Sequence, residues 1–217
     1  MSTNSDKTRI RSADELFQRG AQFLEICALL DKHNVTYFIQ GGVLLGAVRE
    51  NYFIKWDWDV EISVFSVEFR PVFENVVADL VKHGYSVLKT DQAIERLKID
   101  FYKGPSPEAT TFTIFGWYHD SRSSSYRRKA LRIPEHYLNP LSSITFLGRT
   151  VLCPNSVEDY LTFQYGDWKK PMRTADKSSY LSESFSGMQT QLKDEKPKRL
   201  KILASKILKK LTSMKKR

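Results

Sequence analysis

The 217-residue sequence predicts an α+β (α/β) fold, in which helices flank a mixed β-sheet. Two observations support this prediction. Helical and strand-like periodicity alternate over residues 12–82, and further strand-like stretches then cluster over residues 85–118. The pattern lacks the regular alternation of a barrel. No G-x-G-x-x-G sequence follows a strand, which argues against a Rossmann dinucleotide site.

Local signals predict the elements of the first half of the chain. Residues 1–11 are polar and are expected to be disordered, whereas Ser12 and Glu15 form a capping-box sequence that starts a helix reaching His33. The elements expected after it are a strand at 35–40, a short helix at 43–49, a strand at 56–65 and a helix at 67–82.

The second half is predicted to be richer in strands. The expected elements are strands at 85–89, 96–102 and 110–118, a polar loop at 119–130, a hairpin at 143–153 turning at Leu147-Gly148, and a helix at 156–165 with Ser156 as its N-cap. Residues 174–195 are polar and are expected to be weakly ordered.

Composition excludes several classes of protein. Hydrophobic residues make up 41% of the chain, enough for a packed core, but no stretch reaches the roughly 18 apolar residues of a membrane helix. No apolar segment resembling a secretory signal occurs near the N-terminus, so a cytoplasmic protein is expected. Cys27 and Cys153 are expected to be buried free thiols, a disulfide being the alternative. The histidines lack the spacing of a zinc site.

The formal net charge of +9 is concentrated at the C-terminus. Residues 193–217 contain eleven Lys and Arg and two Asp and Glu, so 11 − 2 = +9, and the rest of the chain sums to zero. The body of the protein is therefore not expected to bind nucleic acid. Apolar residues recur within the tail as a helical stripe, at Leu200, Leu203, Ile207, Leu211 and Met214. A helix over 196–217 would suit an anionic membrane surface; a partner-docking helix and a disordered tail are the alternatives.

Three acids alternate along the strand predicted at 56–65. Asp57, Asp59 and Glu61 share one face, and the opposite face is apolar. Carboxylates this close repel one another, and oxygen ligands at close range suit Mg²⁺ or Mn²⁺. The alternative is an edge strand with a solvated acidic face.

The Gly41-Gly42 pair favours the metal interpretation. It follows a strand and precedes a helix, where backbone N–H groups can bind an anion such as a phosphate. A phosphate cradle beside a metal site is what phosphoryl or nucleotidyl transfer requires. On the strand predicted at 96–102, Asp100 could complete the metal site or act as general base. Arg96 and Lys98 on the same face could hold phosphate oxygens, and an exposed charged face is the alternative.

Two segments resemble the LicD/fukutin family of nucleotidyltransferase-fold phosphotransferases. Residues 40–49 (QGGVLLGAVR) and 53–62 (FIKWDWDVEI) are similar to its long first motif, and residues 165–171 (YGDWKKP) are similar to its closing segment. The resemblance covers about residues 12–172, predicted as the catalytic domain, with 173–195 as a linker. The family's middle Asp is Trp58 here, its last Asp is Glu61, and its Thr after the glycines is Val43.

The resemblance implies a function. It implies metal-dependent transfer of phosphocholine or a polyol phosphate from a CDP-activated donor to a cell-surface glycan, such as lipopolysaccharide or capsule. It implies metal ligation by Asp57, Asp59, Glu61 and Asp100. Substrate contacts are expected from Gly41, Gly42, Arg49, Arg96, Lys98, Tyr165, Asp167 and Trp168. The alternatives are a nucleotidyltransferase that modifies a small molecule or protein, and a non-catalytic module that binds membrane or nucleic acid.

Overall fold

The computed structural model describes residues 8–108 and 110–186. Their strands form one mixed sheet in the order β3-β4-β5-β2-β1-β9-β8, and a β6–β7 hairpin extends from the end of β5. β2 pairs antiparallel with β1 and parallel with β5. The strands are β1 (Tyr37–Ile39), β2 (Asp59–Phe65), β3 (Ser86–Asp91), β4 (Lys98–Tyr102), β5 (Thr111–Asp120), β6 (Ser125–Arg128), β7 (Leu131–Pro134), β8 (Ser142–Phe146) and β9 (Arg149–Cys153).

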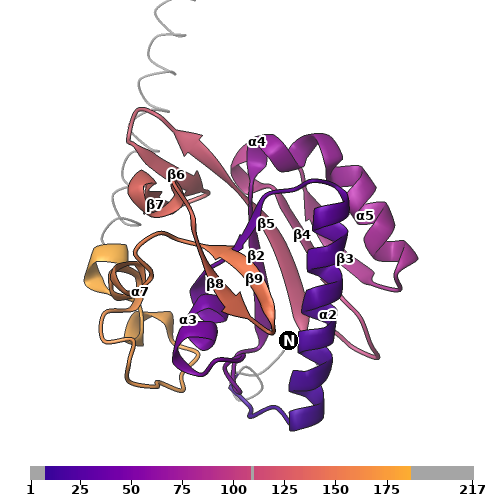
Figure 1. Ribbon diagram of the computed structural model, residues 1–217, viewed down its shortest axis with the longest axis horizontal. Coiled ribbons are helices and arrows are strands. Elements are labelled where there is room, and N and C mark those ends of the chain that lie inside the picture. Colours follow the sequence, from indigo (N-terminus) through magenta and orange to yellow (C-terminus); the bar gives the residue numbers. More distant parts are fainter. Residues whose placement is uncertain (1–7, 109, 187–217) are drawn as a thin grey trace, which may run out of the picture.

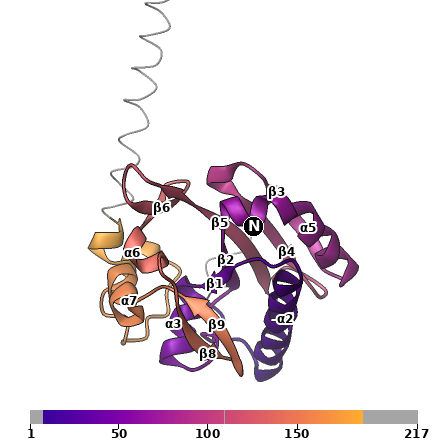
Figure 2. The ribbon, with the colours of Figure 1, turned by 45° about the horizontal axis from the view of Figure 1, so that its top comes forward.

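Helices flank both sides of this sheet, as the sequence predicts. Figures 1 and 2 show α2 and α5 side by side on one side of the molecule and α3 and α7 together on another. The inward face of the central strands packs under α2 and α5, with Val60, Phe101 and Phe112 fully buried. The helices are α2 (Ala13–Lys32), α3 (Gly41–Arg49), α4 (Ser66–Phe69), α5 (Phe73–Lys82), α6 (Glu135–Leu138) and α7 (Val157–Tyr165).

Several local predictions are confirmed. The capping box at α2 has both reciprocal bonds: the Glu15 N–H donates to Ser12 Oγ at 3.2 Å, and the Ser12 N–H donates to Glu15 Oε2 at 2.9 Å. The β8–β9 hairpin turns at Leu147-Gly148, where both residues have positive φ. Cys27 and Cys153 are buried free thiols.

Other boundaries differ from the prediction. The helix expected at 67–82 is broken by a 3-10 turn at Arg70–Val72, because Pro71 supplies no backbone N–H for a continuous helix. β2 begins at Asp59 rather than Trp56, and β4 begins at Lys98 rather than Arg96. Ser156 does precede α7, but it lies in the left-handed region and its side chain makes no capping bond.

The polar loop predicted at 119–130 is wrong. β5 continues to Asp120 and is followed by β6, whose Ser125 and Arg128 are buried. The β6 strand carries polar and basic side chains, so this segment lacks the apolar alternation that signals a strand.

Both ends of the described chain pack against the domain. Arg11 is buried, and its N–H donates to the Lys55 carbonyl at 2.9 Å, although residues 1–11 were expected to be disordered. Residues 174–186 were expected to be weakly ordered, yet Phe185 is buried and the Ser182 N–H donates to the Gln164 carbonyl at 3.0 Å. The predicted tail at 196–217 lies outside the described residues. The other domain boundaries remain predictions.

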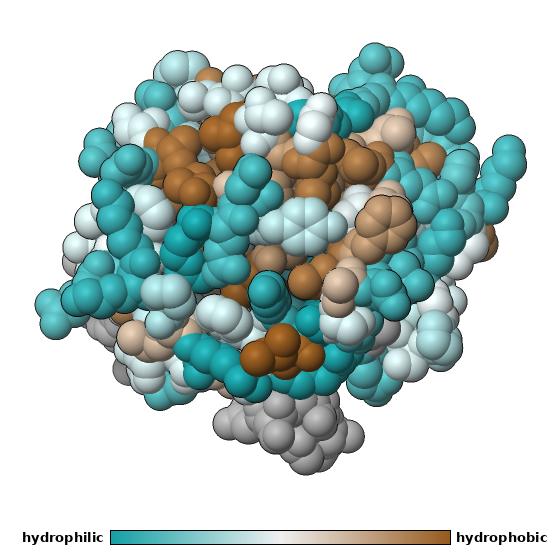
Figure 3. Space-filling view, turned by 60° about the horizontal axis from the view of Figure 1, so that its bottom comes forward, coloured by the Kyte–Doolittle hydropathy of each residue, from teal (hydrophilic) through white to brown (hydrophobic). Residues whose placement is uncertain are grey.

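Within residues 8–108 and 110–186, no helix is both long enough and apolar enough to span a membrane. On the face drawn in Figure 3, hydrophobic side chains gather in a central region surrounded by hydrophilic ones. Grouped apolar side chains of this kind are typical of a binding surface.

Candidate active site

A cavity of about 650 Å³ lies against the face of the sheet opposite α2 and α5. That volume suits a drug-sized or nucleotide-sized ligand. Nine of the twelve predicted site residues line it: Gly41, Gly42, Arg49, Asp57, Asp59, Glu61, Tyr165, Asp167 and Trp168. The sequence-predicted site is therefore largely assembled in one place.

The paired glycines form the first turn of α3, whereas the helix was expected to begin at Val43. Gly41 has φ +60°, a conformation that other residues rarely adopt. A Cβ on Gly42 would lie 2.2 Å from Asp57 Oδ2, and one on Gly41 would lie 3.7 Å from the Tyr165 hydroxyl oxygen. Glycine is thus required for the helix terminus to approach the acids this closely. The first N–H groups of a helix have no acceptor within the helix and favour an anion.

The acids extend from the turn before β2 into the strand itself. Asp59 and Glu61 are partly buried and alternate with the fully buried Val60 and Ile62, as predicted. Asp57 lies in the preceding turn, where its N–H donates to the Ile54 carbonyl at 3.1 Å. β2 lies between β1 and β5, so the alternative of an edge strand with a solvated acidic face is excluded.

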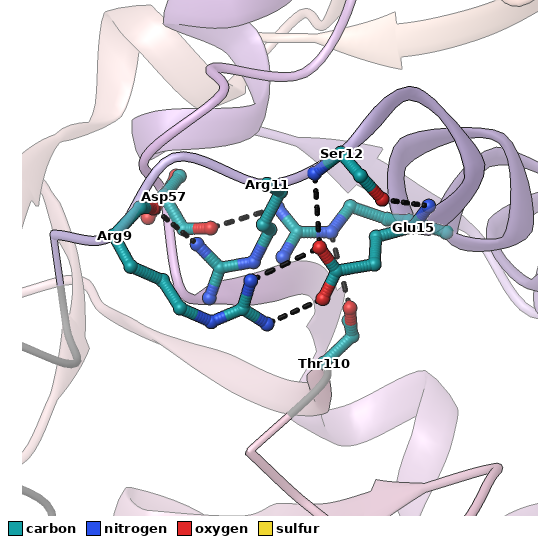
Figure 4. A network of polar contacts seen from close by, with 7 residues as sticks. Arg9, Arg11, Ser12, Glu15, Asp57 and Thr110 are labelled. Carbon is teal, nitrogen blue, oxygen red and sulfur yellow. Dashed lines mark hydrogen bonds and ion pairs between the residues drawn. The ribbon is translucent and has the colours of Figure 1, made fainter.

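Asp57 has an unusual electrostatic environment. Burial raises its pKa to about 6, against the lowering effect of the Arg19 guanidinium, and the neighbouring Glu61 raises it further. Arg19 Nη1 donates to the Asp57 carbonyl oxygen at 2.9 Å, and its Nε donates to Thr110 Oγ1 at 3.2 Å. Figure 4 shows a second set of contacts beside these, in which Arg11 Nη1 donates to the Arg9 carbonyl oxygen and Arg9 donates to the Glu15 carboxylate. Two buried arginines, Arg11 and Arg19, thus lie near the acids, and their positive charges lower the pKa of Asp57 by less than burial raises it.

Asp100 is not brought to the other acids. It does not line the cavity; it accepts a hydrogen bond from Thr113 Oγ1 at 2.7 Å and pairs with Lys98 Nζ at 2.8 Å. Thr113 on β5 lies between Asp100 and Glu61 in the sheet register, so their Cα atoms are about 10 Å apart, two strand spacings.

The predicted phosphate contacts on β4 also lie elsewhere. Lys98 and Arg96 do not line the cavity, and Arg96 lies in a 3-10 turn before β4, where its Nε is 3.1 Å from Asp91 Oδ2.

The metal site predicted at these carboxylates stays a prediction. Within the described part of the chain, no three His, Cys, Asp or Glu side chains are grouped closely enough to hold a metal ion. Magnesium, however, is often held by one or two carboxylates together with substrate phosphates. The raised pKa of Asp57 and the cradle at Gly42, which a Cβ would fill, fit such a shared site. Asp59 and Glu61 would hold the ion there, with Asp57 beside them.

The closing motif forms a wall of the cavity attached to α3. Arg49 donates through Nη1 to the Trp168 carbonyl at 3.2 Å and through Nη2 to Glu50 at 2.9 Å. Trp168 Nε1 donates to Thr162 Oγ1 at 3.2 Å, and Asp167 pairs with Lys170 at 2.9 Å. Arg49 therefore holds this wall in place, which accounts for its position without a phosphate.

Aromatic side chains dominate the rest of the lining. All four tryptophans of the chain face the cavity: Trp56, Trp58, Trp117 and Trp168. Trp58 and Met172 are among the exposed large hydrophobics, at 43% and 51%. Burial raises the pKa of Tyr180 to about 12, with the cavity acids raising it further, and it raises that of Tyr165 well above its ordinary value. Flat aromatic faces suit a nucleobase or a sugar ring.

Sequence reasoning missed several residues of this site. Gln40 accepts a hydrogen bond from the Tyr160 hydroxyl at 2.7 Å in the interior, where it fixes the start of α3 against α7. Tyr180 and Arg128 reach the cavity from segments expected to be a linker and a loop. Gln40 precedes the glycines inside the recognised motif and could have been proposed. Arg128 and Tyr180 carry no local signal.

Comparisons with known proteins agree with the motif. A family model described as LicD/FKTN/FKRP, nucleotidyltransferase domain, matches residues 34–156. Ribitol 5-phosphate transferase FKRP of Homo sapiens and that of Mus musculus are each 25% identical over 154 residues, which is 65% of this chain and 30% of theirs. The uncharacterized protein RP689 of Rickettsia prowazekii is 29% identical over 65% of this chain and 52% of its own. The chain thus matches only about a third to a half of the length of these relatives.

Solved structures are similar at lower identity. The lincomycin-bound lincosamide adenylyltransferase LnuA is 16% identical, with a TM-score of 0.47 over 85% of this chain and 98% of that one. The antibiotic-resistance factor ANT(2'')-Ia in solution is 17% identical, with a TM-score of 0.47 over 88% and 97%.

Proposed function

Because the chain belongs to the LicD/FKTN/FKRP nucleotidyltransferase-domain family, we propose that it transfers a substituted phosphate group from a nucleotide-activated donor to a hydroxyl group of a glycan. The observation that carries this proposal is the convergence of the α3 N-terminus with Asp57 and Glu61. The glycine turn favours phosphate oxygens, and the acids face the same space.

The donor is proposed to be linked to CDP and to carry phosphocholine or a polyol phosphate. This proposal rests on the named activity of the mammalian relatives and on the aromatic lining, which offers surfaces for a base and a sugar. The hydroxyl oxygen forms a bond to phosphorus and loses its proton to solvent, while the bond to the nucleoside monophosphate breaks, so CMP leaves. The α3 N–H groups orient the phosphate, and the segment at 166–185 limits the access of water.

Magnesium or manganese held by Asp59 and Glu61, with Asp57 beside them, would supply the positive charge that neutralises the donor diphosphate. The support is the position of these carboxylates, which line one cavity beside the glycine turn, and the raised pKa of Asp57, caused first by burial and then by the neighbouring charge of Glu61. Asp57 in turn is kept next to the glycines by the turn that its N–H closes.

The acceptor and the place of the reaction are part of the same proposal. The acceptor is proposed to be a cell-surface glycan, modified from the cytoplasmic side, with residues 196–217 bringing the enzyme to the anionic inner face of the membrane. The positive charge of the tail supports this, since lysines and arginines are attracted to anionic lipids.

The test is product identity. Full-length protein is incubated with Mg²⁺ and CDP-ribitol or CDP-choline, with a panel of glycan acceptors, and CMP and pyrophosphate are quantified. We expect CMP release that requires an acceptor. Release of pyrophosphate from a nucleoside triphosphate, with transfer of the nucleotide, would instead identify a nucleotidyltransferase.

Variants connect that turnover to the cavity. Asp59→Asn and Glu61→Gln should abolish CMP release, while the thermal unfolding temperature stays the same or rises, because one of several repelling carboxylates has been neutralised. Glu68→Gln, an exposed acid on α4, is the matched control and should retain activity. Full activity in Asp59→Asn would refute the proposed site.

A further inference from the structure

Arg128 is a buried cation that no step of the proposed reaction uses. It ends β6 and is only 8% exposed, and it lines the cavity. Its guanidinium carbon lies 3.8 Å from the centre of the Phe115 ring, so the planar group stacks on an aromatic face. Stacking leaves the edge of the guanidinium, which carries the N–H donors, directed away from the ring.

Those donors are not satisfied within the described structure. The contact of the Arg128 side chain with the described residues is the Phe115 ring, no hydrogen bond or ion pair joins it to residues 8–108 or 110–186, and its buried Nε has no acceptor there. The other cavity cations differ: Arg49 donates to Trp168 and Glu50, and Lys170 pairs with Asp167. Burying a guanidinium without a partner is costly, so the site is built for an anion that the protein itself does not supply.

Arg128 marks an end of the cavity separate from the glycine turn. Phe115 pairs in register with Ser63, two residues beyond Glu61 on the same face of β2. Two residues along a strand correspond to about 7 Å. Phe115 and Leu131 lie next to Arg128, and Trp117 and Ile133 are further apolar residues of the cavity lining. Burial lowers the pKa of the Arg128 guanidinium, although the negative charges of Glu61 and Asp100 act to raise it.

We propose that Arg128 binds a second anionic group of the substrates, a phosphate or carboxylate, at a subsite about 7 Å along β2 from the acids. The inference rests on the proposed function for the identity of those substrates, but the anion site itself rests on the unpaired guanidinium. A guanidinium edge presents two parallel N–H donors, which match the oxygens of either group. The group belongs either to the donor, beyond its first phosphate, or to the acceptor.

Tryptophan fluorescence provides a direct test, because all four tryptophans line the cavity. Full-length protein with Mg²⁺ is titrated first with CDP and then, at saturating CDP, with inorganic phosphate. Wild type is compared with Arg128→Gln and Arg128→Lys. The matched control is Arg122→Gln, which removes one charge from the exposed turn between β5 and β6.

We expect Arg128→Gln to weaken one of these two titrations at least tenfold, Arg128→Lys to weaken the same one less, and Arg122→Gln to match wild type. Weaker CDP binding would place the anion on the donor. Unchanged CDP binding with weaker phosphate binding would place it on the acceptor side.

Three results would overturn the inference. The first is wild-type affinity for both probes in Arg128→Gln, and the second is no binding of either probe by the wild type. The third is loss of thermal stability in both Arg128→Gln and Arg128→Met, the latter keeping an apolar stem on Phe115, because Arg128 would then serve the fold. Failure of CMP release with intact Arg128-dependent phosphate binding would reject the proposed function and keep the subsite.

Discussion

Replacing Gly42 by alanine tests the geometry on which the proposed chemistry depends. The added Cβ would lie 2.2 Å from Asp57 Oδ2, whereas ordinary contact begins at 3.4 Å, so the oxygen must move by 3.4 − 2.2 = 1.2 Å. Gly42 has no positive φ, so alanine fits the backbone, and the displaced atom is the end of a side chain. The perturbation is therefore confined to the carboxylate.

The energies predict a stable but inactive protein. Alanine gains about 1 kcal/mol over glycine in a helix. Moving Asp57 off its rotamer costs about 0.5–1.5 kcal/mol, which nearly cancels that gain. The thermal unfolding temperature should then change by at most about 3 °C. A misplacement of about 1 Å in an active site can reduce the rate about 100-fold, and we expect that loss in CMP release.

Gly46→Ala on the same helix is the contrasting variant. Its Cβ would lie 2.5 Å from the Tyr52 carbonyl oxygen and 3.0 Å from the Ile54 nitrogen, both backbone atoms that cannot rotate away. Overpacking of this kind costs about 1–3 kcal/mol, so we expect an unfolding temperature several degrees lower. If Gly42→Ala keeps wild-type activity, or loses as much stability as Gly46→Ala, the reasoning about the glycine turn is wrong.

Three further predictions address other parts of the chain. Asp100→Asn should lower stability by about 1 kcal/mol, by weakening its contacts with Thr113 and Lys98, and should keep CMP release within about tenfold of wild type; a loss above 100-fold would restore the predicted role as ligand or base. The hydrogen bond from Arg9 lowers the pKa of Glu15 to about 2, so its stabilising effect is complete above about pH 4.5 and is lost as the pH falls toward 2. Glu15→Gln keeps the capping box and removes only the charge. Because the ion pair is partly exposed, melting curves should show the variant about 0.5–1 kcal/mol less stable than wild type at pH 6 and equally stable near pH 2. An equal difference in stability at both pH values would contradict this. Full-length protein should sediment with anionic vesicles more than a version ending at Glu195, and less so in high salt or after Leu203→Glu or Ile207→Glu; equal sedimentation would reject membrane binding by the tail.

Motifs within a few residues of one another allowed most of the site to be predicted. The glycine pair, the alternating acids at the start of β2 and the closing segment at 165–171 were identified from spacing and family resemblance, and residues of all three line one cavity. The capping box and the hairpin turn at Leu147-Gly148 were predicted for the same reason, since their geometry is specified by adjacent residues.

Predictions that depended on distant pairing were less successful. Asp100 was expected beside the other acids. That expectation used only the face of the strand on which Asp100 lies, which is a local property. The strand order β4-β5-β2 places Thr113 between them, and a pattern of period two says nothing about which strands are neighbours. The β6–β7 hairpin was missed because its buried positions are partly occupied by polar residues, which only contacts with other segments can accommodate.

The sequence by itself determined the family, the glycine turn and the acidic face of β2, because each is written in consecutive residues whose backbone geometry fixes their relation. Only the tertiary structure decided the partners of the charged groups. It placed Arg11 and Arg19 behind Asp57, separated Asp100 from the cavity, and left Arg128 buried on Phe115 without an anion. Electrostatic energy depends on the distance between charged groups and on how deeply those groups are buried. Both are set by contacts between segments far apart in the chain, and neither is encoded in local spacing.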